Sequence, residues 1–300
     1  MQGATNGSVR QVFARSEKPD TLFTEFIRIA NNGKGKIQPS DRRELAANEE
    51  GLPLVVQLIG HDIEALCVAA QSAVAAGVQH LNLNAGCPFG RMGKGPTGGG
   101  LLHYPEHLIA LVKALRAVIP VSFSVKLRAG YDRNDTVLEL LSPFEEAQID
   151  YLILHPRTVA QAYKGAADHR ITAEVVRRTS LPVIANGDIR SAEQGWRLLE
   201  ESGAAGLMLG RGAFADPRLF SRLRRQASSN PNRDERWRDV VTFLEEVSVR
   251  YIERFCGEQQ ILSKLKAVVS LMDDPALMAL LVPLKRSRTL TAFQRILQSV

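Results

Sequence analysis

Residues 80–88 read His-Leu-Asn-Leu-Asn-Ala-Gly-Cys-Pro, and this stretch does more than any other to decide the fold. It has the length of a strand and ends in polar residues, a glycine and a cysteine. The next patterned segment, residues 105–118, has the apolar spacing of a helix. The same unit, a strand pattern followed by a helix pattern, recurs along the chain. Repeated units of this kind predict a parallel sheet, either doubly wound or closed into a barrel.

Strand-length apolar runs recur along the first two thirds of the chain. They cover residues 22–29, 54–59, 80–84, 121–127, 151–154, 183–185 and 206–209. Helix patterns lie between most of them, at residues 62–76, 105–118, 135–148, 172–179 and 192–201. Most of the runs are almost continuously apolar, which is typical of strands that are buried on both faces.

The N-terminal end of the pattern lacks one strand of a closed barrel. Residues 6–15 have a helix pattern, and only a few residues precede them. A (β/α)8 chain should open with a strand that leads into its first helix. We therefore expect an α/β fold, a (β/α)8 TIM barrel whose first strand is missing.

The last quarter of the chain has a different organisation. The segment Ser228-Ser229-Asn230-Pro231-Asn232 has the composition of a polar turn. Helix patterns follow at residues 237–255, 260–272, 276–281 and 289–297, enough for a small all-α helical bundle. We predict a barrel domain at residues 1–227, a linker at residues 228–236 and a helical domain at residues 237–300.

The positive charge of the chain lies in this last quarter. The whole chain has 38 Lys and Arg against 32 Asp and Glu, a formal net charge of +6. Residues 217–300 contain 15 basic and 9 acidic residues, which leaves 23 of each in residues 1–216. Clustered Lys and Arg suggest a polyanionic partner, because they displace counterions from phosphates. The alternative is an Arg-rich helical surface that only meets solvent.

Composition excludes several other classes. Hydrophobic residues make up 45% of the chain and charged residues 23%, as in ordinary globular proteins. No run of about 18 apolar residues and no signal-peptide pattern is present, so we expect a cytoplasmic protein without a membrane partner. Cys67, Cys87 and Cys256 lie far apart without a CxxC pair, which argues against a disulfide framework and against a metal site. We expect a monomer.

Polar residues stand at the carboxyl ends of successive predicted strands, where barrel enzymes build their sites. They are Gln57, Asn84, Lys126, Arg128, His155, Asn186, Asp188 and Arg211. Lys126 within an apolar strand is costly unless an anion or hydrogen bonds compensate its charge. A buried ion pair with a neighbouring carboxylate is the alternative. His155 could be a core histidine with satisfied hydrogen bonds, but its place among other polar strand ends favours a site.

The ends of the last two predicted strands contain glycine. They read Asn186-Gly187-Asp188 and Gly210-Arg211-Gly212. Barrels commonly bind phosphate at these two positions through backbone N–H groups, assisted by a basic side chain. The pair of ends therefore predicts a phosphate site.

A glycine-rich segment follows the stretch that opened this section. Gly86-Cys87-Pro88 is followed by Gly90, Gly93, Gly95, Gly98, Gly99 and Gly100. We expect a long flexible loop over the mouth of the barrel, able to approach a ligand or to move as a lid. Its Arg91 and Lys94 could meet a polyanion. An unstructured insertion is the alternative, but it leaves Cys87 unexplained; the thiol could act as nucleophile or as proton donor.

These residues resemble a known family. Leu81-Asn82-Leu83-Asn84-Ala85-Gly86-Cys87-Pro88 is similar to the signature of the tRNA dihydrouridine synthases. Further similar motifs follow in family order, from Met1 to about Phe220. They are Thr24-Glu25-Phe26-Ile27-Arg28, Val56-Gln57-Leu58, Val125-Lys126-Leu127-Arg128, His155-Pro156-Arg157-Thr158, Val183-Ile184-Ala185-Asn186-Gly187 and Leu209-Gly210-Arg211-Gly212. The first of these most resembles the bacterial branch that modifies position 16 of the tRNA D-loop.

The resemblance implies a chemistry. Members are flavin mononucleotide (FMN) barrels with a helical tRNA-binding domain, in which NADPH reduces the flavin and the flavin reduces the C5–C6 double bond of a uridine. Cys87 would be the acid that protonates C5. The cofactor would be held by Met1, Gln2, Gln57, Lys126, His155, Asn186, Gly187, Asp188, Gly210 and Arg211. The uracil and its flanking phosphate would face Arg28, Asn84, Arg128 and Tyr163.

The sequence departs from the family at both ends. The family usually begins with a strand ending in Ala-Pro-Met and a glycine, whereas this sequence starts at that methionine. We expect a misassigned start codon or a truncated sequence, and a real truncation would leave an open sheet edge and weak flavin binding. In the helical domain, Ile261-Leu262-Ser263-Lys264-Leu265-Lys266 only loosely resembles the family's basic tRNA-contacting helix.

Two other functions fit part of the pattern. A flavin barrel that oxidises or reduces a free small molecule, of the dihydroorotate dehydrogenase type, accounts for the phosphate-binding ends but not for the basic helices. A catalytically weak RNA-binding protein accounts for the basic helices, because loss of the first strand could abolish flavin retention.

Overall fold

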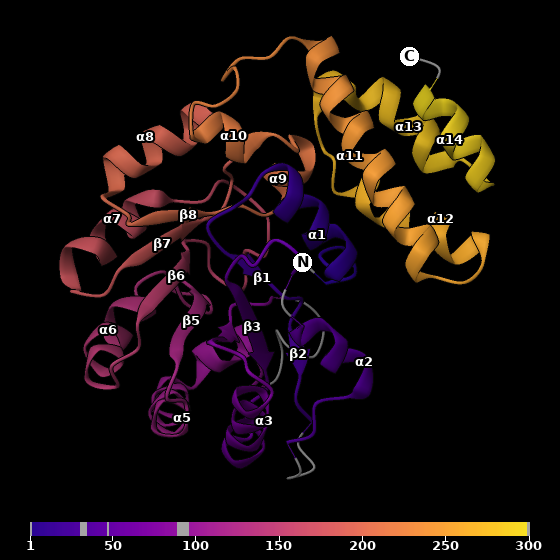
Figure 1. Cartoon of the computed structure of the whole chain (residues 1–300). Helices are drawn as coiled ribbons and strands as arrows, with labels where there is room; N and C mark the ends of the chain where they lie inside the picture. The colour runs from indigo at the N-terminus through magenta and orange to yellow at the C-terminus, as the bar shows by residue number, and fades with distance from the viewer. Residues whose placement is uncertain (1, 31–34, 47, 89–95, 299–300) are drawn as a thin grey trace.

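The computed structural model of the chain describes residues 2–30, 35–46, 48–88 and 96–298. Its centre is one curled parallel sheet (Figure 1). The strands are β1 (Leu22–Phe23), β2 (Ile27–Arg28), β3 (Leu54–Ile59), β4 (His80–Ala85), β5 (Ser122–Arg128), β6 (Tyr151–His155), β7 (Val183–Asn186) and β8 (Gly206–Met208). They pair in the order β1-β3-β4-β5-β6-β7-β8, with β2 also paired to β3. Sequential parallel strands are the arrangement that the repeated units predicted.

Helices follow the strands and cover the outside of the sheet (Figure 1). They are α3 (Ile63–Ala75), α5 (Pro105–Val118), α6 (Thr136–Glu146), α7 (His169–Arg178) and α8 (Ala192–Ser202). Side chains cap several of them: Asp62 accepts from the backbone N–H of Ala65, and Ser191 accepts from that of Gln194. Such caps satisfy backbone donors that the first helical turn leaves unpaired. The predicted helix at 172–179 starts earlier, at His169, because Asp168 caps it.

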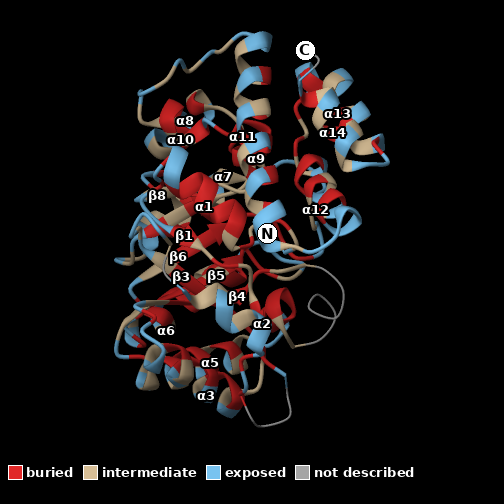
Figure 2. Cartoon of the chain, turned by 45° about the vertical axis from the view of Figure 1, so that its right-hand side comes forward, coloured by how far each residue is buried: buried red, intermediate tan, exposed pale blue. Residues whose placement is uncertain are grey.

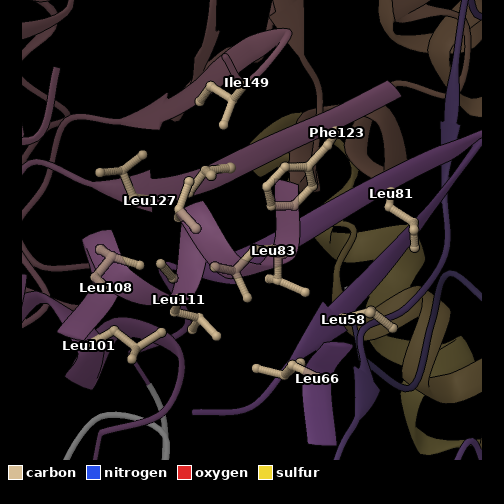
Figure 3. Packing of buried hydrophobic residues seen from close by; sticks show 14 of the residues in the cluster. Leu58, Leu66, Leu81, Leu83, Leu101, Leu108, Leu111, Phe123, Leu127 and Ile149 are labelled. Carbon is tan, nitrogen blue, oxygen red and sulfur yellow. The ribbon is translucent and has the colours of Figure 1, made fainter. Parts of the chain in front are cut away.

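The two faces of the sheet differ sharply. Alternate residues of the strands point outward and form one apolar core with the covering helices (Figure 3). Leu81 and Leu83 of β4 belong to this core, together with Leu66 of α3 and Leu108 and Leu111 of α5. The alternate residues between them face the barrel interior and are largely polar. The central strands are largely buried on both faces, as predicted, but their inner face is polar rather than apolar.

The predicted strand at 22–29 is interrupted. Phe23 pairs with Val55 and Ile27 pairs with Leu58, so the chain advances four residues while β3 advances three. One extra residue in one strand is a β-bulge, which bends the strand and re-aims its side chains. Thr24 within the bulge accepts a hydrogen bond at Oγ1 from the backbone N–H of Gln57, at 3.0 Å. The bulge therefore helps to hold β3 beside the mouth.

The sheet does not close among the described residues, since β8 and β1 have no strand between them. Helix α1 (Gly7–Ser16), which begins after the N-cap Asn6, lies near this opening (Figure 1). Its Phe13 ring lies 5.8 Å from that of Phe214 and 4.9 Å from that of Phe243. The expected barrel with a missing strand is confirmed, and α1 packs toward the C-terminal helices.

Short elements complete the barrel region: α2 (Pro39–Arg42), η1 (Arg43–Leu45), η2 (Gly98–His103), α9 (Arg211–Ala215) and α10 (Leu219–Leu223). The C-terminal region contains α11 (Arg233–Arg254), α12 (Glu258–Ser270), η3 (Pro275–Leu277), α13 (Met278–Arg286) and α14 (Leu290–Gln298). Helix α11 begins four residues before the predicted position. Asn232 and Glu235 form a capping box there, so the predicted linker at 228–236 is partly helical.

The helical region shares a core with the barrel end. Val9, Val12 and Phe13 of α1 and Phe214 of α9 pack in one apolar cluster with α11–α14 (Figure 2). Glu44 links the same parts, because it pairs with Arg10 at 3.0 Å and with Arg254 of α11. The predicted division into two domains stays a prediction. None of the helices in the described ranges combines the length and apolarity that a bilayer crossing requires.

Candidate active site

An amide network lines the inner face of the sheet. Asn84 Nδ2 donates to Gln57 Oε1, Gln57 Nε2 donates to Asn82 Oδ1, and Asn82 Nδ2 donates to Ser124 Oγ, each at 2.8 Å. Register places Gln57, Asn82 and Ser124 side by side on β3, β4 and β5. All of these side chains are buried, and the network satisfies polar groups that would otherwise be costly. It fixes the floor of the mouth.

Asn84 also positions Cys87. Its Oδ1 accepts the backbone N–H groups of Gly86 and Cys87, both at 3.0 Å, which closes a tight turn after β4. Gly99 holds the other side of the cysteine, donating its N–H to the Cys87 carbonyl at 3.0 Å. Side chains at position 99 are excluded, because a Cβ there would lie 2.9 Å from that carbonyl oxygen and 2.8 Å from Val159. The thiol-bearing residue is thus held from both sides.

The glycine-rich segment is therefore less uniform than expected. Gly98, Gly99 and Gly100 are buried in η2, so this part is a packed turn, and the prediction of a flexible loop was wrong for it. Gly90, Gly93, Gly95, Arg91 and Lys94 lie outside the described residues. Cys87 itself is half-buried.

Lys126 stands without a counter-ion among the described residues. No carboxylate in the described part of the chain lies within ion-pair distance of its ammonium group, and no hydrogen bond satisfies it. Burial, together with the nearby Arg128, lowers the pKa of Lys126 from 10.5 to about 8, and Cys87 opposes this fall. The alternative of a buried ion pair is not supported. A cation left unpaired at the mouth of a barrel indicates an anionic or electron-rich ligand.

His155 sits at the carboxyl end of β6, opposite Arg128 of β5 in the register. Its Nε2 accepts a hydrogen bond from Arg157 Nη1 at 3.1 Å. Burial and the surrounding cations, Lys126 first, lower the pKa of His155 from 6.5 to about 2. The imidazole is therefore neutral at physiological pH.

Asp188 is held by Arg157. Both of its carboxylate oxygens pair with Arg157, at 3.0 and 2.6 Å, and one also accepts the N–H of Ala167 at 2.9 Å. Hydrogen bonds from Arg157 keep the pKa of Asp188 low, although burial alone would raise it. The carboxylate charge is thus neutralised within the protein. The backbone of Asp188 has a φ of 53°, in the left-handed region.

The ends of β7 and β8 form a group of free donors. Asn186 Nδ2 donates to the carbonyl of Met208 at 2.8 Å and ties the two ends together. In the described chain, no acceptor meets the backbone N–H groups of Gly187, Asp188 or Gly210. Arg211 follows, with its guanidinium 4.0 Å from Asp188. Free N–H groups and a guanidinium suit a phosphate, and the phosphate site stays a prediction.

Arg128 and Tyr163 connect the two sides of the mouth. Arg128 is 1% exposed and donates to the carbonyls of Gly86, Thr158 and Ala162, at 3.0, 2.8 and 2.7 Å. These bonds hold the cysteine turn against the loop after β6. The half-exposed ring of Tyr163 has Arg128 at 5.4 Å and Arg211 at 4.6 Å from its centroid. The bonds of Arg128 describe a positioning role, and its predicted contact with the substrate stays a prediction.

The remaining predicted residues are more peripheral. Arg28 is exposed at the end of β2, and among the described residues it has no ion pair. Gln2 is exposed, and Met1 lies outside the described residues.

Three further site residues were missed by the sequence reasoning: Asn82, Ser124 and Arg157. The first two lie within strands, not at their ends, and only the alternation along β4 and β5 could have indicated them. Arg157 lies in a motif that the resemblance included, but nothing local shows that it meets both His155 and Asp188. No group of three His, Cys, Asp or Glu in the described ranges is arranged to hold a metal ion.

Fold and site together define a β/α-barrel enzyme whose polar mouth joins a thiol, an unpaired lysine and a phosphate-type donor group. The family model of the dihydrouridine synthases matches residues 1–274. The chain therefore belongs to the dihydrouridine synthase family and is an oxidoreductase. The predicted resemblance is confirmed.

Relatives of two named kinds are similar to the chain. The tRNA-dihydrouridine(16) synthase of Pseudomonas putida is 32% identical over 82% of this chain and 78% of its own length. The tRNA-dihydrouridine synthase B of Vibrio parahaemolyticus is 34% identical over 86% of this chain and 80% of its own. Because both kinds match at similar identity, assignment to the position-16 branch stays a prediction.

Solved structures of similar fold are more distant in sequence. Morphinone reductase superposes with a TM-score of 0.56 at 14% identity, covering 77% of this chain and 83% of its own. The old yellow enzyme homologue from Zymomonas mobilis superposes with a TM-score of 0.55 at 13% identity, covering 76% and 85%. At these identities the likeness concerns the fold alone.

Proposed function

We propose that this protein reduces the C5–C6 double bond of a D-loop uridine in tRNA, at position 16, using FMN and NADPH. Support comes from the family, from the names of its relatives and from one observation in the site. That observation is Cys87, held by Asn84 and Gly99 beside the unpaired Lys126.

The residues present fit FMN. Its phosphate is an anion that suits the free N–H groups of Gly187, Asp188 and Gly210 and the guanidinium of Arg211. Lys126 supplies an uncompensated positive charge that suits an electron-rich ring. Gln57, His155 and Asn186 complete the polar lining, and Gln2 is proposed to contribute from the N-terminus. When bound, FMN would bring the electrons that NADPH delivers.

Cys87 supplies the proton in this proposal. A thiol S–H can donate its proton as a general acid. The turn held by Asn84 and Arg128 places it at the mouth, where a uracil ring could lie. The second Nδ2 hydrogen of Asn84 is left to orient a carbonyl of that ring. The base must leave the helical stack to reach this position.

The C-terminal helices supply the tRNA contact. Many arginines near α11 are already ion-paired, including Arg222, Arg236 and Arg250. Arg286, Arg288 and Arg295 are exposed at the end of α13, after it and on α14, and within the described chain they have no carboxylate partner. Unpaired arginines on the outer helices suit a phosphate backbone. With Arg28 at the mouth, they would hold the tRNA while Tyr163 and Arg128 border the base.

The alternatives are less well supported. A dehydrogenase of a free small molecule does not need unpaired arginines on the C-terminal helices. A catalytically weak RNA-binding protein does not need an unpaired Lys126, which is costly without a ligand.

The test is mass-spectrometric mapping of dihydrouridine in tRNA from cells that lack the gene and from cells complemented with it. Loss at D-loop position 16, restored by the gene, is the expected result. Loss at another position would correct the branch, and no loss at any position would favour the small-molecule alternative.

Purified protein separates the chemical roles. Cys87→Ala should keep its FMN and its NADPH oxidation but lose dihydrouridine formation. Cys67→Ala, on the outer face, is the matched control and should keep all three. Dihydrouridine formation undiminished in Cys87→Ala would remove the thiol from the reaction.

A further inference from the structure

Arg157 contacts the one histidine of the mouth in a way that decides where its proton lies. Arg157 is 3% exposed, and its Nη1 lies 3.1 Å from His155 Nε2. A guanidinium can only donate hydrogen bonds, and it stays protonated in proteins. Nε2 of His155 must therefore be the acceptor. A neutral imidazole with Nε2 as acceptor has its proton on Nδ1.

Backbone packing closes the same edge of the ring. A Cβ at position 187 would lie 2.7 Å from His155 Cδ2 and 2.9 Å from Nε2. The backbone of Gly187 is also held by His169, because the Gly187 carbonyl oxygen lies 3.0 Å from His169 Nε2. The Nε2 edge thus faces protein, and Nδ1 makes no hydrogen bond to any residue in the described ranges.

Two other residues hold the Arg157 side chain in the position from which it contacts His155. Asp188 binds it through two oxygens, and the Gly165 carbonyl accepts from Nη2 at 2.6 Å. A bidentate pair sets the plane of the guanidinium as well as its position. The order of support therefore runs from Asp188 to Arg157 to His155.

We propose that Arg157 is a positioning residue that holds His155 as the neutral Nδ1–H tautomer and so presents a fixed hydrogen-bond donor to the mouth. The proposal rests on the proposed function for its ligand, the bound flavin, whose ring carbonyl and nitrogen atoms accept hydrogen bonds. His155 is then a donor that never serves as an acid, which leaves Cys87 as the proton source.

The charges around the ring agree with this role. Lys126 and Arg128 face it from β5, Arg157 from its own loop and His169 from α7, and the Asp188 carboxylate is paired with Arg157. Burial, then these cations, lowers the pKa of His155 to about 2, so protonation does not compete with the tautomer near neutral pH.

The direct test is a two-bond ¹⁵N–¹H correlation spectrum of the histidine rings in the full chain, recorded without FMN or tRNA. The chain has six histidines, and His155→Gln identifies the signal by its loss. The expected spectrum shows a protonated Nδ1 and an unprotonated Nε2, unchanged from pH 5 to pH 8. A protonated Nε2, or titration within this range, would overturn the proposal whether or not any variant folds.

Variants then test the cause. In Arg157→Met the neutral ring should show mixed Nδ1–H and Nε2–H tautomers. Asp188→Asn keeps the donor from Arg157 and should retain the Nδ1–H form, and Arg170→Met, at an exposed arginine paired with Asp168, is the matched control. An unchanged Nδ1–H tautomer in Arg157→Met would show that Arg157 does not set it.

FMN binding tests the ligand. Arg157→Met should weaken FMN binding roughly tenfold, as expected for one misplaced hydrogen bond. Unchanged FMN affinity with a changed tautomer would overturn the assignment of this donor to the flavin. The tautomer is read without cofactor or substrate, so its outcome is separate from failure of the proposed function, which would appear as absent dihydrouridine.

Discussion

Lys126 should destabilise the protein in the absence of its ligand. The ammonium group has no ion pair in the described part of the chain, and burial lowers its pKa from 10.5 to about 8. Each pKa unit corresponds to about 1.4 kcal/mol, so the upper bound of this cost is roughly 3 kcal/mol. Lys126 as a whole residue is only half-buried. Solvent there reduces the cost to about 1–2 kcal/mol.

Lys126→Met is therefore expected to stabilise the FMN-free protein. Methionine has a similar length without the charge, and about 1–2 kcal/mol in a chain of this size raises the Tm by about 2–6 °C. The same variant should retain less FMN after purification. A residue that costs stability while serving a ligand is typical of functional sites.

The stability cost of the Lys126 charge should change with pH in one direction. A lysine whose pKa is lowered in the folded state binds fewer protons there than in the unfolded chain. Its cost is complete below pH 8 and is relieved as the pH rises from 8 toward 10.5. The Tm advantage of Lys126→Met over the natural protein should therefore shrink between pH 7 and pH 9.5.

Thermal unfolding followed by circular dichroism at both pH values is the assay, and Lys113→Met is the control. Lys113 is exposed and pairs with Glu146, so its removal should change the Tm little. A Lys126→Met protein that is less stable than the natural one at pH 7, or an advantage that does not shrink with pH, would refute this account of the lysine.

Three further changes probe the supports of the site. Asn84→Ala removes the acceptor for two backbone N–H groups, so it should destabilise the fold by about 1–3 kcal/mol and reduce dihydrouridine formation more than NADPH oxidation. Arg128→Met leaves three carbonyls without their donor and should lower the free energy of unfolding by about 3 kcal/mol or more in urea titrations. Glu44→Gln should remove stability that the natural protein has near pH 7 but loses in acid, because Arg10 and Arg254 lower the pKa of Glu44 below 4.5.

For each of these three variants, one result would contradict the prediction. Equal losses of both activities in Asn84→Ala would mean that the turn supports the flavin site as a whole. A stable Arg128→Met protein that fails only in tRNA turnover would return the arginine to its predicted place at the substrate. For Glu44→Gln, a stability difference that stays the same from pH 7 to pH 3 would exclude the ion pairs as its cause.

The sequence determined the order of elements and most of the chemistry of the mouth. Strand-length apolar runs alternating with helix patterns were enough to predict the parallel sheet, because each pattern repeats with the period of its own backbone. Polar residues at the strand ends predicted where the site lies, since parallel strands bring their carboxyl ends to one edge. The resemblance added the family and the role proposed for Cys87.

Only the tertiary structure decided which polar groups are already satisfied. Arg128 and Asp188 look like ligand contacts in the sequence, yet one is bonded to three carbonyls and the other is paired with Arg157. Lys126, which could equally have been paired, has no ion pair among the described residues. These outcomes depend on register and on loops that are distant in sequence, such as those holding Gly86 and Ala162.

The same holds for the N-terminal helix and the glycine-rich segment. Helix α1 was predicted correctly as a helix. Its Phe13 packs against Phe214 at the end of the barrel and against Phe243 of α11, a contact that the sequence did not predict. Gly99 looked like part of a flexible loop, yet contact with Cys87 and Val159 requires a glycine there. Local pattern sets what an element is, whereas burial against distant partners sets what it does, because packing and hydrogen bonding are satisfied only in three dimensions.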